Sequence, residues 1–319
     1  MLHVSEEAGF ILYIIEGSVI VLINLAVIFI VLCPNLLRDR KMLVLLGGLC
    51  ISDTINAVAY LTAGVYRLLV IRSGDGNKEI SRYECFLQPH NVFFYFGYQL
   101  TSIMTMVVSF DRLVAVFCPV KHICFTMGKF NTYWVLLALF LVACVSFAAA
   151  FFIQSTDHDI FINIYCYFIF TLERNVWDFV LLFRVITIGL SVVVYIPICW
   201  KVRMMIKHHN QPKKLIKITT TIGLSAVSAL LCLFIPDLLM FVDKENLEQY
   251  HKYFYIIGLN KSLINAFIYM LRHREIRKGF VLALKRPFGF KVSHSGWAYV
   301  DHVSVLHPPM HSHAGTSSK

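Results

Sequence analysis

The chain has 319 residues, of which 58% are hydrophobic and only 15% are charged, and its mean hydropathy is +0.67. This composition is too apolar for a soluble domain and predicts an integral membrane protein. The formal net charge of +10 is explained by attraction between basic residues and the anionic lipid of the inner leaflet. Membrane lipid is therefore an expected partner, and a nucleic acid is not.

Seven windows of the sequence are long and apolar enough to cross a bilayer, which takes about 20 consecutive, mostly apolar residues in a helix. In chain order they cover residues 9–33, 42–71, 86–110, 133–153, 176–200, 215–242 and 253–271. Windows longer than the bilayer is thick indicate helices that tilt or extend into water. We predict an all-α bundle of seven transmembrane helices over residues 9–271, preceded by a short segment at 1–8.

The polar connectors between these windows alternate in charge. Those after the first, third, fifth and seventh windows are strongly basic, as at Lys213, Lys214 and Lys217, whereas the others mix both signs, as at Asp243 and Lys244. Lysine and arginine are retained on the cytoplasmic side of a membrane. The pattern therefore predicts an extracellular amino terminus and a cytoplasmic carboxyl terminus.

Two of the nine cysteines fall on the predicted outer side. Cys85 lies at the start of the third window, and Cys166 lies in the connector after the fourth. Both would meet oxidising surroundings, so the sequence favours a disulfide between them. The alternative is a pair of free thiols.

The stretch SFDRLVAVFCPVKH, residues 109–122, places an acid and a base side by side where the third window ends. At that depth the charged heads of Asp111 and Arg112 can reach the interface while their stems stay among neighbouring helices. An ion pair that only supports structure would satisfy this pattern. A switch that is released on activation would satisfy it too.

These residues resemble a signature of rhodopsin-like G-protein-coupled receptors. The Asp-Arg-Tyr signature of that family reads Asp111-Arg112-Leu113 here, and Pro119 follows seven residues after the arginine. Further residues match family positions in order on the expected helices: Asn24, Asp53, Trp134, Tyr195, Pro236, Asn265 and Tyr269. The resemblance covers roughly residues 9–284. It is greatest to nematode serpentine chemoreceptors of the Srsx type, through ISDTINAVAY and MTMVVSFDRLVAVFCPVKH.

The resemblance implies a chemoreceptor of the plasma membrane that couples to a heterotrimeric G protein and takes an unknown small-molecule or peptide ligand. On activation the sixth helix would swing outward about Pro236, and the freed Arg112 would contact the G protein. The expected switch residues are Asp111, Arg112, Pro119, Tyr195, Phe234, Pro236, Asn265 and Tyr269. No cofactor, resident metal or enzymatic activity is expected. A ligand-gated channel or transporter is the alternative function.

The chain departs from the family pattern in several places. Ala266 replaces the proline of the last-helix motif, and Phe234 stands where many relatives have tryptophan. The spacing from Cys85 to Arg112 is two residues longer than usual in the family. The start of the sixth window, KKLIKITT, is purely basic, so Arg112 cannot pair with an acid there.

A polar core is expected around Asp53. In relatives the acid of the second helix binds sodium with help from polar groups on the third and seventh helices, and Thr101 and Asn265 occupy suitable positions here; Asn24 is the matching residue of the first helix. Lys261 lies one turn before Asn265 and hence on the same helical face. We predict that Lys261 replaces the sodium ion as a tethered cation. Alternatively, it faces another polar cavity or extends outward to the interface.

The ligand candidates lie near the outer ends of the helices. Helical spacing selects Phe94, Tyr95, Tyr98 and Gln99 on the third helix, and packing is the alternative role for these residues. Arg184 and Asp237 are ionisable residues within the membrane, which suggests a site. They either pair with each other or leave Arg184 free for a ligand carboxylate.

Beyond the last window, residues 272–286 place apolar residues on one face among basic ones. This pattern predicts an amphipathic helix on the inner membrane surface. The remaining residues, 287–319, are rich in His, Ser, Gly and Pro and are expected to be a disordered cytoplasmic tail.

Overall fold

The computed structural model describes residues 2–32, 41–118, 129–155, 160–207, 213–243 and 250–272. The chain divides into two compact units, Met1–Phe280 and Val281–Lys319, and all described residues lie in the first. The predicted amphipathic helix from residue 273 onward and the predicted tail lie outside the described residues, as does Pro119.

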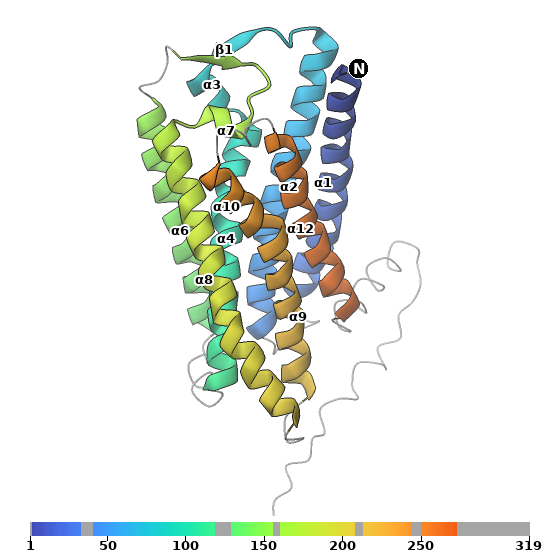
Figure 1. The fold of residues 1–319 in the computed structure, drawn as a ribbon, viewed down its shortest axis with the longest axis vertical. Coiled ribbons are helices and arrows are strands. Elements are labelled where there is room, and N and C mark those ends of the chain that lie inside the picture. Colours follow the sequence, from blue (N-terminus) through green and yellow to red (C-terminus); the bar gives the residue numbers. More distant parts are fainter. Residues whose placement is uncertain are drawn as a thin grey trace, which may run out of the picture. The chain divides into compact units, whose positions relative to one another are not determined.

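Long helices occupy all seven predicted windows (Figure 1). They are α1 (Leu2–Leu32), α2 (Lys41–Ser73), α4 (Pro89–Phe117), α6 (Lys129–Gln154), α8 (Arg174–Lys207), the joined elements α9 (Lys213–Ala229), η1 (Leu230–Phe234) and α10 (Ile235–Val242), and α12 (His251–Arg272). The sixth window alone is divided, because a π-helical turn, η1, interrupts it. Several helices extend past their apolar windows, and α1 begins as early as Leu2.

Six of these helices, among the described residues, are long and apolar enough to cross a membrane. Their outward faces carry large apolar side chains, such as Val145 and Phe152, both 71% exposed. Such exposure would be costly in water but suits contact with lipid. The seventh long helix, α12, is not among these six spans of the described residues.

The contacts between the helices determine which of them surround the interior of the bundle. α2 packs against α1 and α4, α4 packs against α8, and α12 packs against α1, α2 and α9. This arrangement places α2, α4, α9 and α12 around one polar centre. Residues of these helices that are far apart in the chain can therefore meet inside the membrane.

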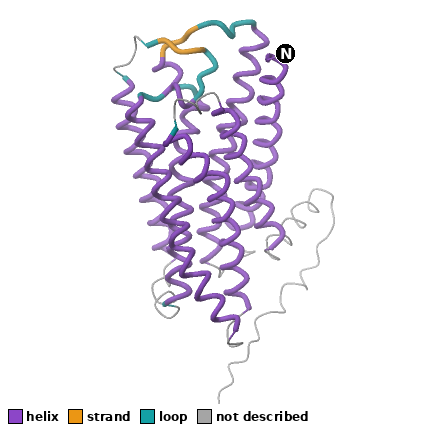
Figure 2. The backbone as a smooth tube through the Cα atoms, in the orientation of Figure 1, coloured by secondary structure: helices purple, strands orange, loops and turns teal. Residues whose placement is uncertain are grey.

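One end of the bundle is covered by the connectors that follow α2 and α6. Strand β1 (Glu79–Ser81) pairs antiparallel with β2 (Phe161–Asn163) (Figure 2). Ile80 lies opposite Ile162 in this pair. Short helices α3 (Arg82–Phe86) and α7 (Phe168–Thr171) follow the two strands. A disulfide joins Cys85 to Cys166, which confirms the predicted bond. We call this end the disulfide end, and the opposite one the Arg112 end.

Candidate functional site

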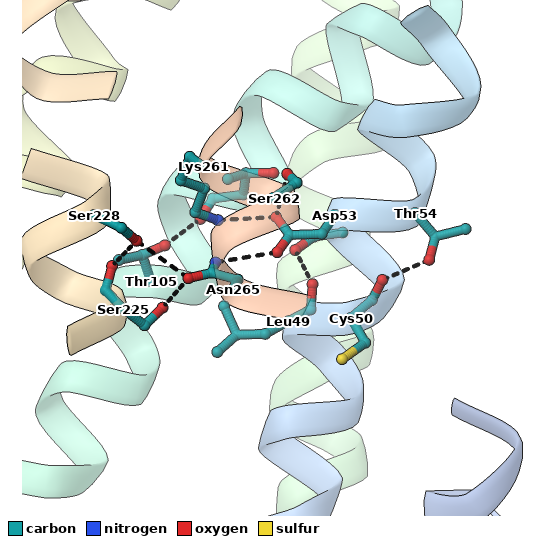
Figure 3. A network of polar contacts seen from close by, with 12 residues as sticks. Leu49, Cys50, Asp53, Thr54, Thr105, Ser225, Ser228, Lys261, Ser262 and Asn265 are labelled. Atoms are coloured by element: carbon teal, nitrogen blue, oxygen red, sulfur yellow. Dashed lines mark hydrogen bonds and ion pairs between the residues drawn. The ribbon is translucent and has the colours of Figure 1, made fainter. Parts of the chain in front are cut away.

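The polar centre of the bundle is built on Asp53 of α2 and Lys261 of α12 (Figure 3). The Nζ atom of Lys261 lies 2.8 Å from Oδ1 of Asp53, and each side chain is only 1% exposed. A carboxylate and an ammonium buried this deeply each cost several kcal/mol unless they neutralise each other. The structure thus shows the pairing predicted from the sequence.

Asn265 extends this pair into a network that reaches a third helix. Its Nδ2 donates to Oδ2 of Asp53 over 3.2 Å, while the hydroxyl of Ser262 donates to Oδ1 over 3.2 Å. On its other side Asn265 Oδ1 accepts hydrogen bonds from the hydroxyls of Ser225, at 2.7 Å, and Ser228, at 3.2 Å. Hydrogen bonds therefore connect α2, α12 and α9 through one asparagine side chain (Figure 3).

Two other residues expected in this core do not join the network in the described part of the chain. Asn24 on α1 is 1% exposed and Thr101 on α4 is 4% exposed. Asn24 Nδ2 and Thr101 Oγ1 make no hydrogen bond among the described residues. Sequence position identified these as buried polar residues, but side-chain direction decided which of them contact Asp53.

The Arg112 end holds the acid and base of the third-helix motif. Arg112 is 1% exposed and pairs with the neighbouring Asp111. One turn earlier on α4, the hydroxyl of Ser109 hydrogen-bonds to that of Ser191 on α8. Burial of a guanidinium at the end of a helix bundle keeps its charge away from any partner outside the bundle.

A cavity lies between the polar centre and Arg112. Its volume is about 10 Å³, roughly what one water molecule needs. α2, α4, α8 and α9 supply its lining, which is Leu49, Thr105, Val108, Ser109, Tyr195, Ser225 and Ala226. The hydroxyl of Tyr195 is buried and makes no hydrogen bond among the described residues. Tyr269 lies in α12, but its side chain is outside the described residues, so the structure places it only by its helix.

The sixth helix is locally widened just before its proline. The N–H of Ile235 donates to the carbonyl of Leu230, five residues back, which is the π-helical pattern. Pro236 follows at the start of α10 and has no N–H to donate. Phe234, in the same π turn, packs in a cluster with Ile188 and Leu233. Such π segments are frequent at functional sites.

Replacing Pro236 with alanine is expected to stiffen this turn. Alanine supplies the missing N–H, so we expect the free energy of unfolding to rise by about 1 kcal/mol. This is less than the roughly 3 kcal/mol that a proline costs in a regular helix, because the π turn already accommodates the proline ring. Hydrogen exchange followed by mass spectrometry should show slower exchange at residues 230–236. The matched control is Pro197→Ala, which replaces a proline inside α8. If both variants slow exchange at residues 230–236 equally, the prediction is contradicted.

The disulfide end holds the other predicted ionisable pair. Arg184 Nε of α8 lies 2.8 Å from Asp237 Oδ2 of α10, so these residues pair with each other. The guanidinium of Arg184 also lies over the ring of Tyr98, with 3.9 Å from its central carbon to the ring centroid. This cation–π contact is strengthened by the absence of bulk water around buried groups.

The four predicted ligand residues of α4 face two different neighbours. Phe94 and Tyr98 contact Phe168 of α7, with ring centroids 5.7 and 5.4 Å apart. Tyr95 and Gln99 instead hydrogen-bond to Ser146 of α6, at 2.8 and 2.9 Å between side-chain atoms. The structure therefore does not bring all four into one site. Only Phe94 and Tyr98 lie beside the Arg184–Asp237 pair and its aromatic surroundings.

Phe168 closes the disulfide end over these residues. Its side chain is fully buried and contacts Trp177 of α8 as well as Phe94 and Tyr98. It follows Cys166 by two residues, and Cys166 has a positive φ of 46°. The disulfide and this backbone turn direct the aromatic side chain into the bundle.

Arg67 of α2 holds the same segment and was not identified from the sequence. It is 1% exposed, and it donates to the carbonyls of Tyr165, at 3.0 Å, and Cys166, at 3.4 Å. Its guanidinium lies 4.3 Å from the Tyr167 ring centroid. An arginine inside an apolar window is itself a signal of a buried partner, and it could have been flagged on that ground.

Comparisons with known proteins agree with this architecture. The chain matches the family described as serpentine type 7TM GPCR chemoreceptor Srsx over residues 18–284. That match includes all of α12, so the seventh helix completes the multi-pass membrane bundle predicted from the sequence. A comparison with curated proteins found no match. Because the family match spans most of the chain, this protein belongs to the Srsx family of serpentine seven-transmembrane chemoreceptors.

Proposed function

We propose that this chemoreceptor binds its ligand at the disulfide end and promotes nucleotide exchange on a heterotrimeric G protein at the Arg112 end. The carrying observation is the burial of Arg112, which is 1% exposed beside Asp111. A charge buried at the end of a bundle can reach an outside partner only if a neighbouring helix moves. Its release would thus depend on a second packing of the helices.

The sixth helix is the element best suited to that movement. The π turn at Leu230–Phe234 and Pro236 divide it into two segments, α9 and α10. Asp237, directly after the proline, contacts Arg184 near Phe94 and Tyr98. A ligand that alters this contact would bias the position of α9, which lines the cavity next to Tyr195.

The orientation and location of the receptor follow from the same proposal. The basic connectors would face the cytoplasm with the Arg112 end, and the disulfide end would face the oxidising exterior of the plasma membrane. The ligand would be a small molecule or a peptide that enters among Phe94, Tyr98, Arg184 and Asp237. Pro119, Tyr269 and the segment 272–286 would lie on the G-protein side.

Arg112→Ala is expected to lower nucleotide exchange to about one tenth or less, since truncating a buried charged contact at a protein interface costs roughly 2–5 kcal/mol. The measurement is GTPγS exchange on a panel of Gα proteins in receptor membranes, with volatile, water-soluble and peptide cues. Arg72→Ala removes an exposed arginine at the disulfide end of α2 and should leave exchange unchanged.

Surface expression of each variant separates lost coupling from lost protein. Exchange by Arg112→Ala equal to that of the unsubstituted receptor would overturn the role of Arg112. Ligand-evoked current or flux without exchange, in cells with the receptor at the surface, would instead establish a channel or transporter.

A further inference from the structure

The buried carboxylate of Asp53 has a cation supplied by the chain itself. Lys261 Nζ lies 2.8 Å from Asp53 Oδ1, and both side chains are 1% exposed. The two residues are 208 positions apart in the sequence, so the fold, and no local motif, creates the contact. An ammonium at this distance neutralises the carboxylate without an ion from solution.

The other groups around Asp53 are arranged as hydrogen-bond donors. Ser262 donates to Oδ1, and Asn265 donates to Oδ2 through Nδ2. A sodium ion is a hard cation and, like other hard cations, needs several oxygen atoms directed toward it. The oxygen that Asn265 could offer points away and accepts hydrogen bonds from Ser225 and Ser228. The groups present do not fit the sodium site that the family resemblance implies.

Electrostatics leads to the same conclusion. A sodium ion at Asp53 would lie within a few ångströms of the Lys261 ammonium, inside a region with little water to screen the two positive charges. Repulsion between like charges is strong at such separations in a protein interior. Binding would require Lys261 to leave its contact, yet its buried position offers no described acid other than Asp53 within an ion-pair distance.

We propose that Lys261 permanently occupies the cation position at Asp53, which makes the folded receptor insensitive to sodium. Shortening Lys261 removes the ammonium and leaves a space where the end of its side chain was. The buried carboxylate of Asp53 and the hydroxyl of Ser262 lie beside this space. Asn265 can then turn its amide oxygen toward that space. The proposal therefore predicts a latent sodium site that opens when Lys261 is shortened. It goes beyond the proposed function, because it concerns ion binding and stability and needs neither ligand nor G protein.

Thermal unfolding in detergent or nanodiscs tests the proposal, with sodium chloride compared against potassium chloride and choline chloride at equal ionic strength. The unsubstituted receptor should have the same Tm in all three salts. Lys261→Ser should have a Tm roughly 2–5 °C higher in sodium chloride than in the other two. The matched control, Lys261→Ser with Asp53→Asn, removes the carboxylate as well and should lose this sodium dependence.

Each result decides part of the proposal. A sodium-specific rise in the Tm of the unsubstituted receptor would overturn it, and that measurement does not depend on how any variant folds. If Lys261→Ser folds without a preference for sodium, or fails to fold in sodium chloride while the double variant folds, the latent site is refuted. Absence of nucleotide exchange would count against the proposed function alone, since none of these measurements involves exchange.

Discussion

Asp53→Asn is expected to lower the free energy of unfolding by about 3–5 kcal/mol, the cost of breaking a buried ion pair by removing one partner. The substitution leaves the Lys261 ammonium 1% exposed and without its counter-charge. It also replaces one carboxylate oxygen of Asp53 with an NH2 group, which donates hydrogen bonds. In the structure these oxygens accept hydrogen bonds from Ser262 and Asn265. Unfolding in detergent by heat or denaturant, with surface expression in cells, measures the loss.

The double variant Asp53→Asn with Lys261→Met should recover most of that loss. Methionine has a similar length and volume and carries no charge, so the uncompensated ammonium disappears. Partners in direct contact are expected to give strongly non-additive effects in such a cycle. If the two single changes add to the value of the double variant, the ion pair contributes no coupling and the interpretation fails.

Arg67→Met is expected to release the segment that covers the disulfide end. The substitution removes the Arg67 donor from the carbonyl of Tyr165 and one of two donors from the carbonyl of Cys166, which also accepts from Nδ2 of Asn91 at 3.2 Å. A hydrogen bond to a charged group contributes about 1.5–3 kcal/mol, so we expect a loss of roughly 2 kcal/mol in the free energy of unfolding, chiefly from the Tyr165 carbonyl. Hydrogen exchange at residues 160–171 should become faster, because the disulfide still holds Cys166 while the backbone around it loosens.

Two further variants make this test specific to Arg67. Arg72→Met changes an exposed arginine on the same helix and should leave exchange at 160–171 as it was. Arg67→Lys keeps the charge but lacks the planar fork that contacts two carbonyls and the Tyr167 ring together, so it should restore protection only in part. Unchanged exchange in Arg67→Met would show that the disulfide and the β1–β2 pair hold the segment without it.

Apart from Asp111 and Arg112 at the end of the bundle, three groups of buried charged residues lie in the described part of the chain, each with different surroundings. Lys261 pairs with Asp53 at the polar centre, and Arg184 pairs with Asp237 beside Tyr98. Arg67 has two backbone carbonyls and aromatic rings as its partners. The first two arrangements join separate helices by opposite charges, whereas the third attaches a connector to a helix. We expect the first two to control helix packing and the third to control access to the disulfide end.

Several features of this protein were determined by the sequence alone. Apolar windows of about 20 residues must become helices in lipid, because every backbone N–H and C=O needs a partner there. The seven helices, the Cys85–Cys166 bond and the family resemblance followed from hydropathy, compartment and motif order. Helical spacing even placed Lys261 on the face of Asn265, from which its contact with Asp53 was predicted.

The tertiary structure alone decided most of the other side-chain contacts. Tyr95 and Gln99 share the third helix with Phe94 and Tyr98, yet they face Ser146 of α6. The hydrogen bonds from Ser225 and Ser228 to Asn265, the π turn before Pro236 and the contacts of Arg67 were also absent from the sequence prediction. The reason is physical. The hydropathy of a window depends only on consecutive residues of the chain, so it predicts where a helix lies. Contacts between side chains depend on how each helix is rotated and shifted against the others.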